Sequence, residues 1–178
     1  MVSRMVANLS VPVTERDHVQ GSTDAAVTLV EYGDYECPYC GRAHSIVKQL
    51  QKVVGGNLRF VFRHFPLAQI HPHAQRAAEA AEAAGAQGRF WQMHDLLYEN
   101  QQTLDDRHLL LFAEAIDLDT ERFVREVAEG IYRERVRGDF MGGVRSGVNG
   151  TPTFFINGVR HDGPWEIDSL LYAIEHAV

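Results

Sequence analysis

Apolar and polar positions near the start of the chain predict a strand, a helix and a second strand. Residues 27–32 form a short run of apolar and β-branched residues between turn formers, which is typical of a buried strand. From Pro38 onward, apolar positions recur at helical spacing until Gly55 ends the pattern. Residues 58–65 then alternate in the manner of a second strand. This order predicts a βαβ unit with parallel strands and a right-handed crossover.

A long block of helical periodicity follows, with no strand pattern inside it. The predicted helices cover residues 73–86, 89–100, 105–116, 119–128 and 131–148. Asp105 and Asp119 stand at the starts of two of these helices, where aspartate commonly acts as a cap. The block is about 80 residues long, which is far more than one crossover helix needs. We therefore interpret it as an insertion.

Strand character returns near the C-terminus, and a last helix closes the chain. Residues 153–156 read as a strand, Asn157-Gly158 marks a tight turn, and residues 159–161 should pair back antiparallel. Residues 165–178 carry apolar positions on one helical face. The whole order predicts one α/β sheet domain interrupted by an all-helical domain. The expected parts are an N-terminal extension, 1–16, a discontinuous α/β domain, 17–65 and 149–178, and the helical insertion, 66–148.

Composition and charge narrow the classes of function. The chain has 178 residues with 45% hydrophobic residues, enough to bury a full core. Its net charge of −7 argues against nucleic acid or an anionic membrane as the main partner. No apolar run approaches the roughly 20 residues that span a bilayer, so we expect a chain that is not embedded in a membrane. The N-terminus shows no convincing secretion signal, which predicts a cytoplasmic protein, or an extracytoplasmic one if a signal has been removed.

The chain contains two cysteines, and both lie in the motif Cys37-Pro38-Tyr39-Cys40 between the first strand and the first helix. Cys37 directly precedes the predicted helix, where the helix dipole and unpaired N–H groups stabilise a thiolate. A thiol pKa of about 8.5 can fall to roughly 3.5–7.5 in such a position. Cys37 is therefore the expected attacking sulfur. Cys40 lies one helical turn further on the same face, which suits a resolving sulfur.

Two other uses of the cysteine pair stay open at this point. A structural disulfide would add little stability, because so short a loop restrains little of the unfolded chain. A zinc site could combine Cys37, Cys40 and His44, but tetrahedral zinc needs a fourth ligand and the sequence holds no second CxxC or Cys-His pair. We therefore expect no metal. His71 and His73 are expected to be surface or capping residues.

Acidic residues surround the motif in sequence. Asp34 and Glu36 precede Cys37, and a nearby negative charge disfavours a thiolate. We expect both acids to lie in a solvated loop. Glu31 lies on the predicted buried strand, where it either relays the proton that leaves Cys40 or is a tolerated buried acid. Both interpretations of Glu31 stay open.

A second motif, Gly150-Thr151-Pro152-Thr153, directly precedes the last two strands. A proline entering a strand removes one ladder hydrogen bond and often marks a cis turn. Such a turn would present the Thr151 backbone at the sheet edge, where an extended substrate chain could pair with it. Pro152 alone could equally be an ordinary turn proline. Together with the CxxC motif, the cis interpretation is favoured.

The two motifs together resemble a known family. Residues 30–40 (VEYGDYECPYC) and 147–158 (GVNGTPTFFING) look like the DsbA-like branch of the thioredoxin superfamily. The order of predicted elements is similar too, since that branch has a thioredoxin fold interrupted by an all-helical domain. The resemblance covers the chain from about Asp17 onward. It implies thiol–disulfide oxidoreductase activity without a dissociable cofactor, because the Cys37–Cys40 disulfide is itself the redox group.

The resemblance also implies roles for individual residues and partners. The implied catalytic residues are Cys37 as nucleophile, Cys40 as resolving cysteine and Glu31 as buried acid, and the implied substrate-binding residues are Thr151, the cis-proline Pro152, Pro38 and Tyr39. Expected partners are protein or peptide thiols and disulfides, together with a redox partner that recycles the dithiol. That partner could be a quinone-linked membrane protein, thioredoxin or glutathione.

Two departures and two alternatives qualify this expectation. The strongest oxidases of the family often carry histidine where this chain has Tyr39, so we hypothesise that the dithiol is a weaker oxidant. The absence of a clear signal leaves the direction of electron flow open. One alternative is a glutathione-dependent disulfide reductase. The other is a binding module that holds unfolded chains and uses the dithiol as a redox switch.

Overall fold

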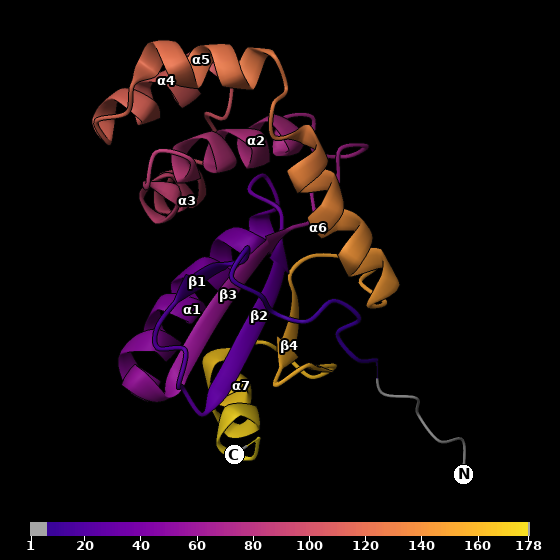
Figure 1. Cartoon of the computed structure of the whole chain (residues 1–178). Helices are drawn as coiled ribbons and strands as arrows, with labels where there is room; N and C mark the ends of the chain where they lie inside the picture. The colour runs from indigo at the N-terminus through magenta and orange to yellow at the C-terminus, as the bar shows by residue number, and fades with distance from the viewer. Residues whose placement is uncertain (1–6, 178) are drawn as a thin grey trace. The chain divides into compact units, whose positions relative to one another are not determined.

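The computed structural model describes residues 7–177, which form one five-stranded sheet, seven α-helices and a short 3-10 helix at Gly55–Asn57 (Figure 1). The strands are β1 His18–Gln20, β2 Val27–Gly33, β3 Leu58–His64, β4 Thr153–Ile156 and β5 Val159–Arg160. The helices are α1 Pro38–Val54, α2 Ala74–Gly85, α3 Phe90–Glu99, α4 Asp106–Ala115, α5 Thr120–Ala128, α6 Arg133–Arg145 and α7 Ile167–Glu175. The predicted α/β class with a helical block between two parts of one sheet is confirmed.

The strands follow the order β1-β3-β2-β4-β5 across the sheet. β1 pairs with β3, β2 with β4, and β4 with β5, each in antiparallel fashion. β2 and β3 are neighbours joined through α1, and they run in the same direction in Figure 1, as expected for the βαβ unit. β1 was not predicted from the sequence.

Local sequence explains where several elements begin and turn. Asp105 caps α4 by accepting hydrogen bonds from two backbone N–H groups of the first turn, and Asp119 caps α5 in the same way through one. Asn157 and Gly158 have φ angles of 47° and 81°, the left-handed values that a tight hairpin turn requires. The predicted capping residues and the hairpin are therefore confirmed.

Packing divides the chain into two compact units. The first contains the described residues 7–33, 42–63 and 141–177, and the second contains Asp34–Gly41 and His64–Phe140. A division by packing does not test where independent domains begin, so the predicted domain boundaries stay a prediction. The predicted N-terminal extension is described only from residue 7, because residues 1–6 lie outside the described part of the chain.

The first unit is built on the sheet. Helix α1 buries the side chains of Ala43, Val47 and Leu50, and its Gln51 donates a hydrogen bond to Gln20 of β1 (2.8 Å). The segment after residue 6 is tied to the sheet edge, where a backbone bridge joins Asn8 to Val159 of β5. Within the predicted extension, Asn8 thus pairs with the edge strand of the sheet.

A buried arginine fastens the same N-terminal segment to β3. Arg63 donates hydrogen bonds to both carboxylate oxygens of Asp17 (2.8 and 3.1 Å), to the Tyr32 hydroxyl (3.0 Å), and to the carbonyls of Val11 (2.8 Å) and Pro12 (3.0 Å). Burial alone would lower the pKa of Arg63. The hydrogen bonds and charges of Asp17 and Tyr32 outweigh that effect and raise the pKa, so the guanidinium stays charged.

The second unit is built around the alanine-rich helix α2. This helix packs against α3, α4 and α5, and its alanines are buried on almost every side. Small side chains allow the neighbouring helices to approach closely, which explains why so short a helix can be almost enclosed. Two acidic residues of α2, Glu79 and Glu82, are buried with the alanines.

Candidate active site

Cys37 directly precedes α1 and occupies the position expected of a helix cap. Its carbonyl accepts the first helical hydrogen bond from the Gly41 N–H (3.1 Å), and its own N–H donates to the Asp34 carbonyl (3.2 Å). Pro38 is the first helical residue, where a missing N–H costs nothing. The structure holds Cys37 and Cys40 as buried thiols.

Helix α1 favours an anion at Cys37. The first turn of α1 contains no acidic side chain, so its N–H groups and the positive end of the dipole act on the Cys37 sulfur unopposed from within the helix. Tyr39, between the two cysteines, is 58% exposed. The motif therefore combines a buried sulfur pair with an exposed aromatic ring on the same helical turn.

The carboxylate of Asp34 is buried and accepts three hydrogen bonds. The Glu36 backbone N–H donates to Oδ1 (2.8 Å), while the Leu67 backbone N–H and the His71 ring Nδ1 donate to Oδ2 (2.8 Å each). An ionised carboxylate only accepts, so Nδ1 of His71 carries the hydrogen. The expectation that Asp34 lies in a solvated loop is therefore wrong. Two of its three donors, the Leu67 N–H and the His71 ring, come from a segment that is more than 30 residues away in sequence.

The carboxylate of Glu36 is bound entirely by one residue. The backbone N–H of His73 donates to Oε2 (2.6 Å), and the ring Nδ1 of the same residue donates to Oε1 (2.9 Å). The Glu36 side chain is 18% exposed and that of His73 is 47% exposed. Glu36 therefore lies in a partly exposed loop, as predicted in part, but its carboxylate is bound by His73. His73 is the residue that precedes α2, so Glu36 binds at the start of that helix.

Side chains of α3 and of the loop that follows it make hydrogen bonds to Tyr35 and to the Cys37 backbone. The Tyr35 hydroxyl lies 2.9 Å from Nδ1 of His94. The Gln101 side-chain amide donates to the carbonyls of Tyr35 (2.9 Å) and Cys37 (2.8 Å). Any Cβ at position 41 would overlap the Gln101 side chain, which explains the glycine directly after the motif.

Replacing Gln101 by alanine is expected to lower the free energy of unfolding by roughly 1–3 kcal/mol, because two partly buried carbonyls lose their side-chain donor. Urea denaturation measures the change. Gln102→Ala is the matched control, since Gln102 is exposed and adjacent, and it should change stability by less than about 0.5 kcal/mol. Equal losses in the two variants would contradict the role given to Gln101.

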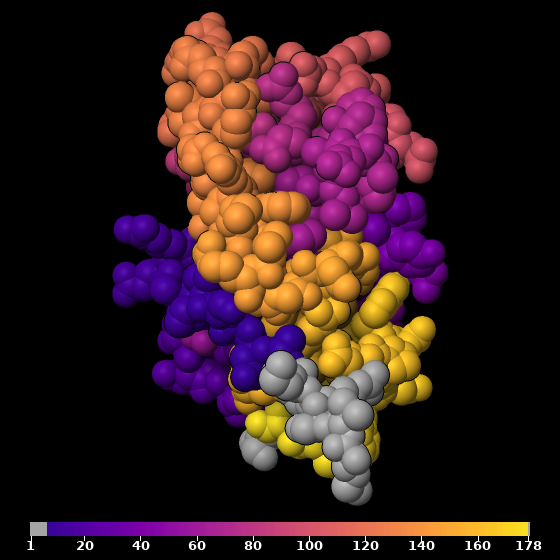
Figure 2. Space-filling model, turned by 90° about the vertical axis from the view of Figure 1, so that its right-hand side faces the viewer, coloured from indigo at the N-terminus to yellow at the C-terminus, as the bar shows by residue number. Residues whose placement is uncertain are grey.

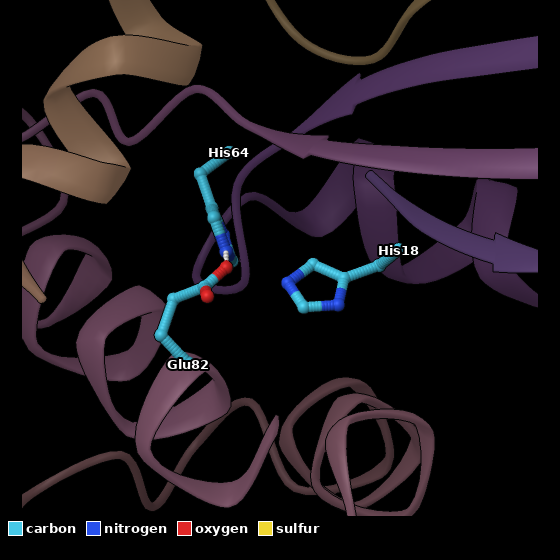
Figure 3. A group of neighbouring side chains, drawn as sticks. All are labelled: His18, His64 and Glu82. Carbon is cyan, nitrogen blue, oxygen red and sulfur yellow. Dashed lines mark hydrogen bonds and ion pairs between the residues drawn. The ribbon is translucent and has the colours of Figure 1, made fainter. Parts of the chain in front are cut away.

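A cluster of charged side chains that includes His64 lies beside Tyr35, since the rings of His64 and Tyr35 have centroids 5.9 Å apart. His64 Nε2 and Glu82 Oε1 are hydrogen-bonded at 2.7 Å, an interaction drawn as a dashed line in Figure 3, and the His64 backbone N–H donates to Asp139 (3.1 Å). Arg135 pairs with Asp139 (3.2 Å). Burial raises the pKa of Asp139, and the charges of His64 and Arg135 oppose that rise. His18, also drawn in Figure 3, belongs to β1 of the first unit.

The second unit also has a surface pocket of about 620 Å³. Most of the residues that line it are close in sequence to His64, Arg135 and Asp139. It is lined by residues 66–70, Gln75, Arg133, Arg137 and Phe140. Leu67, which lines the pocket, is the residue whose N–H donates to Asp34. In Figure 2, orange atoms that include those of α6 lie beside atoms of the magenta region.

The remaining predicted site residues belong to the first unit. Glu31 is buried in β2, and its Cα lies opposite that of Phe154 in β4. The Thr151–Pro152 peptide bond is cis, as the motif predicts. β4 begins at the next residue, Thr153, opposite Tyr32 near the end of β2. The chain leads from that end of β2 directly into the segment that carries the cysteines.

Sequence reasoning missed the residues that hold the segment before Cys37. The sequence predicts His71 and His73 at the surface or as caps, and it indicates no role for His94 or Gln101. Their sequence signal is weak, since His71, His73 and Gln101 are polar residues in or beside loops, and His94 is a single polar residue within α3. One sequence pattern could have indicated His71 and His73. The run His-Pro-His directly precedes an alanine-rich helix and lies downstream of two acids beside a cysteine.

Comparison with known proteins identifies the family. The family model described as Thioredoxin matches residues 13–176, and the chain therefore belongs to the thioredoxin family. A thioredoxin-like oxidoreductase from Silicibacter pomeroyi DSS-3 is 30% identical, with a TM-score of 0.81 over 92% of this chain and 93% of that one. Oxidised BdbD from Bacillus subtilis is 26% identical, with a TM-score of 0.81 over 90% and 92%.

The fold is also similar to that of DsbA structures. The fold of Wolbachia pipientis alpha-DsbA1 matches with a TM-score of 0.81 over 95% of this chain and 94% of that one, at 20% identity. The thioredoxin-like fold and its likeness to DsbA-like structures, predicted from two motifs and the order of elements, are thus confirmed.

The curated relatives are longer proteins that are named as sodium–proton antiporters. The Na(+)/H(+) antiporter NhaA 1 of Salinispora arenicola is 50% identical over 177 residues, which are 99% of this chain and 27% of that protein. NhaA 3 of Salinispora tropica is 49% identical over 98% and 27%. The chain thus spans about a quarter of these relatives. Among residues 7–177, no helix has both the length and the apolar character needed to cross a membrane.

Proposed function

We propose that this chain is a thiol–disulfide oxidoreductase that exchanges disulfides with protein or peptide thiols through Cys37 and Cys40. The observation that carries the proposal is the placement of Cys37 as the residue before α1, in a chain of the thioredoxin family. The oxidoreductase neighbours support the same chemistry. No dissociable cofactor is required, because the two sulfurs carry the electrons.

The exchange proceeds in two steps that balance two electrons and two protons. In the reducing direction, the Cys37 thiolate attacks one sulfur of a substrate disulfide, and the other substrate sulfur leaves and takes up a proton. Cys40 loses its proton and attacks the Cys37 sulfur of the mixed disulfide. The Cys37–Cys40 bond forms and the second substrate thiol leaves. Oxidation of a substrate dithiol is the reverse sequence.

The other predicted site residues have supporting roles in this proposal. Glu31 accepts the proton that leaves Cys40, which suits a carboxylate buried in β2. The Thr151 backbone, with Pro152, binds an extended substrate segment as an added strand. Pro38 and the exposed Tyr39 contact the substrate beside the attacking sulfur.

The recycling partner and the compartment set the direction. A reducing cytosol keeps the dithiol reduced and favours substrate reduction, whereas an oxidising compartment favours disulfide formation. The partner is a thiol reductant in the first case and an oxidant, such as a quinone-linked membrane protein, in the second.

Trapping the intermediate tests the proposal. Cys40→Ser should stop at the mixed disulfide and accumulate a covalent adduct with a cystine-containing peptide, detected by intact mass and released by dithiothreitol. The double variant Cys37→Ser, Cys40→Ser is the control and should form none. If Cys40→Ser forms no adduct, the proposed exchange is wrong.

The curated relatives favour a second candidate function, in which the same dithiol regulates a sodium–proton antiporter that carries this segment. Sodium–proton exchange would be measured in vesicles containing the full-length protein that carries this sequence. The exchange rate should then change with the thiol–disulfide potential and lose that dependence in Cys37→Ser. Exchange that is absent or insensitive to redox state would exclude this candidate.

A further inference from the structure

We propose that His71 and His73 are positioning residues for the Cys37 thiolate, because they bind the two carboxylates that precede Cys37 and offset their negative charge. This inference rests on the proposed function and adds two residues to the same site. It concerns only the segment Asp34–Gly41 and the residues of the second unit that hold it.

The Asp34–His71 pair is the more buried of the two. The Asp34 side chain is fully buried and that of His71 is 17% exposed, with 2.8 Å between carboxylate oxygen and ring nitrogen. A buried carboxylate is costly unless its oxygens are hydrogen-bonded, and here both are. His71 is the one partner of the three that can also carry a positive charge.

The Glu36–His73 pair joins the segment to the start of α2. Both oxygens of Glu36 are used, one by the backbone N–H and one by the ring of His73. A negative charge at a helix N-terminus is stabilised by the helix dipole. The charge of Glu36 is therefore balanced by α2 and by His73, although Glu36 directly precedes the attacking cysteine.

These contacts bear on the chemistry of Cys37 through charge. Two carboxylates one and three residues before a thiol disfavour its ionised form. The groups that act on them are the two histidine rings, the backbone N–H groups of Leu67, Glu36 and His73, and the α2 dipole. The α1 dipole favours the thiolate directly. Removing a histidine ring that binds one of these carboxylates should therefore make Cys37 less acidic.

Substitution by glutamine separates charge from hydrogen bonding, because glutamine donates an N–H but stays neutral. His71→Gln and His73→Gln should each raise the Cys37 pKa by about half a unit to one unit. The pKa is read from the pH dependence of Cys37 alkylation by iodoacetamide, with the alkylated residue identified by mass spectrometry. His108→Gln is the matched control, because His108 makes an equivalent pair with Asp105 (2.6 Å) at the start of α4, and it should leave the value unchanged.

A double-mutant cycle completes the test. In an Asp34→Asn background the carboxylate is absent, so His71→Gln should no longer shift the Cys37 pKa. If either glutamine variant leaves the pKa unchanged in the otherwise native chain, the inference is overturned. His73 is half exposed, so its variant should fold even if His71→Gln does not. Thiol pKa values need no turnover, and a protein that shifts as expected but forms no mixed disulfide would overturn the proposed function alone.

Discussion

Replacement of Cys37 by serine is expected to abolish disulfide exchange in both directions. Reduction of insulin and oxidation of a reduced model protein should each fall by about a thousand-fold or more, to the rate without the protein. A serine hydroxyl ionises too weakly to attack a disulfide and forms no disulfide with Cys40. The position at the start of α1 that favours a thiolate does not compensate for the lost sulfur.

Two controls make the Cys37→Ser result specific. Cys40→Ser should retain the first attack and lose turnover, so the two cysteines should fail at different steps. Circular dichroism should show that both variants keep the fold. Activity that persists in Cys37→Ser would instead support a binding module in which the dithiol serves as a redox switch.

Arg63→Leu is expected to lower the free energy of unfolding by about 3–5 kcal/mol, the usual result of removing one partner from a buried ion pair. Asp17 would keep a carboxylate whose side chain is only 6% exposed, without the guanidinium that neutralises it. The Tyr32 hydroxyl and the carbonyls of Val11 and Pro12 would lose a donor as well. Urea denaturation at pH 7 measures the loss.

Arg59 provides the matched control for Arg63. It lies on the same strand, β3, and donates one hydrogen bond to the Thr28 hydroxyl (3.0 Å). Arg59→Leu should therefore cost about 1 kcal/mol. The double change Arg63→Leu with Asp17→Leu should recover part of the loss, since no uncompensated charge remains. A loss in Arg63→Leu no greater than in Arg59→Leu would contradict the proposed anchoring of the N-terminal segment.

Most elements of the fold could be predicted because they bury apolar side chains at regular spacing. β2 and β3 carry buried runs, α1 has a clear apolar face, and Asp105 and Asp119 bind the backbone of the helices that follow them. β1 could not be predicted because it lacks such a buried apolar run. It has three residues at the sheet edge, each only partly buried, so it shows no pattern that a strand search detects.

Some residues of the candidate site could likewise be predicted from the sequence and others could not. Cys37, Cys40 and Pro152 could be selected from sequence because their chemistry or backbone geometry is specific to the residue type. The partners of Asp34 and Glu36 could not, because His71 and His73 lie 37 residues further along the chain and reach them only after the second unit folds. Without those partners, two acids beside a cysteine are reasonably expected to be solvated.

Equilibration with glutathione redox buffers tests the central claim, that Cys37 and Cys40 form a redox-active dithiol. We predict that both thiols disappear together in one two-electron transition, with a reduction potential between about −270 and −120 mV, the range of catalytic members of this chemistry. A value toward the lower end indicates a reductase and one toward the upper end an oxidase. Thiols that titrate independently, or a potential below about −300 mV as in structural disulfides, would contradict the account.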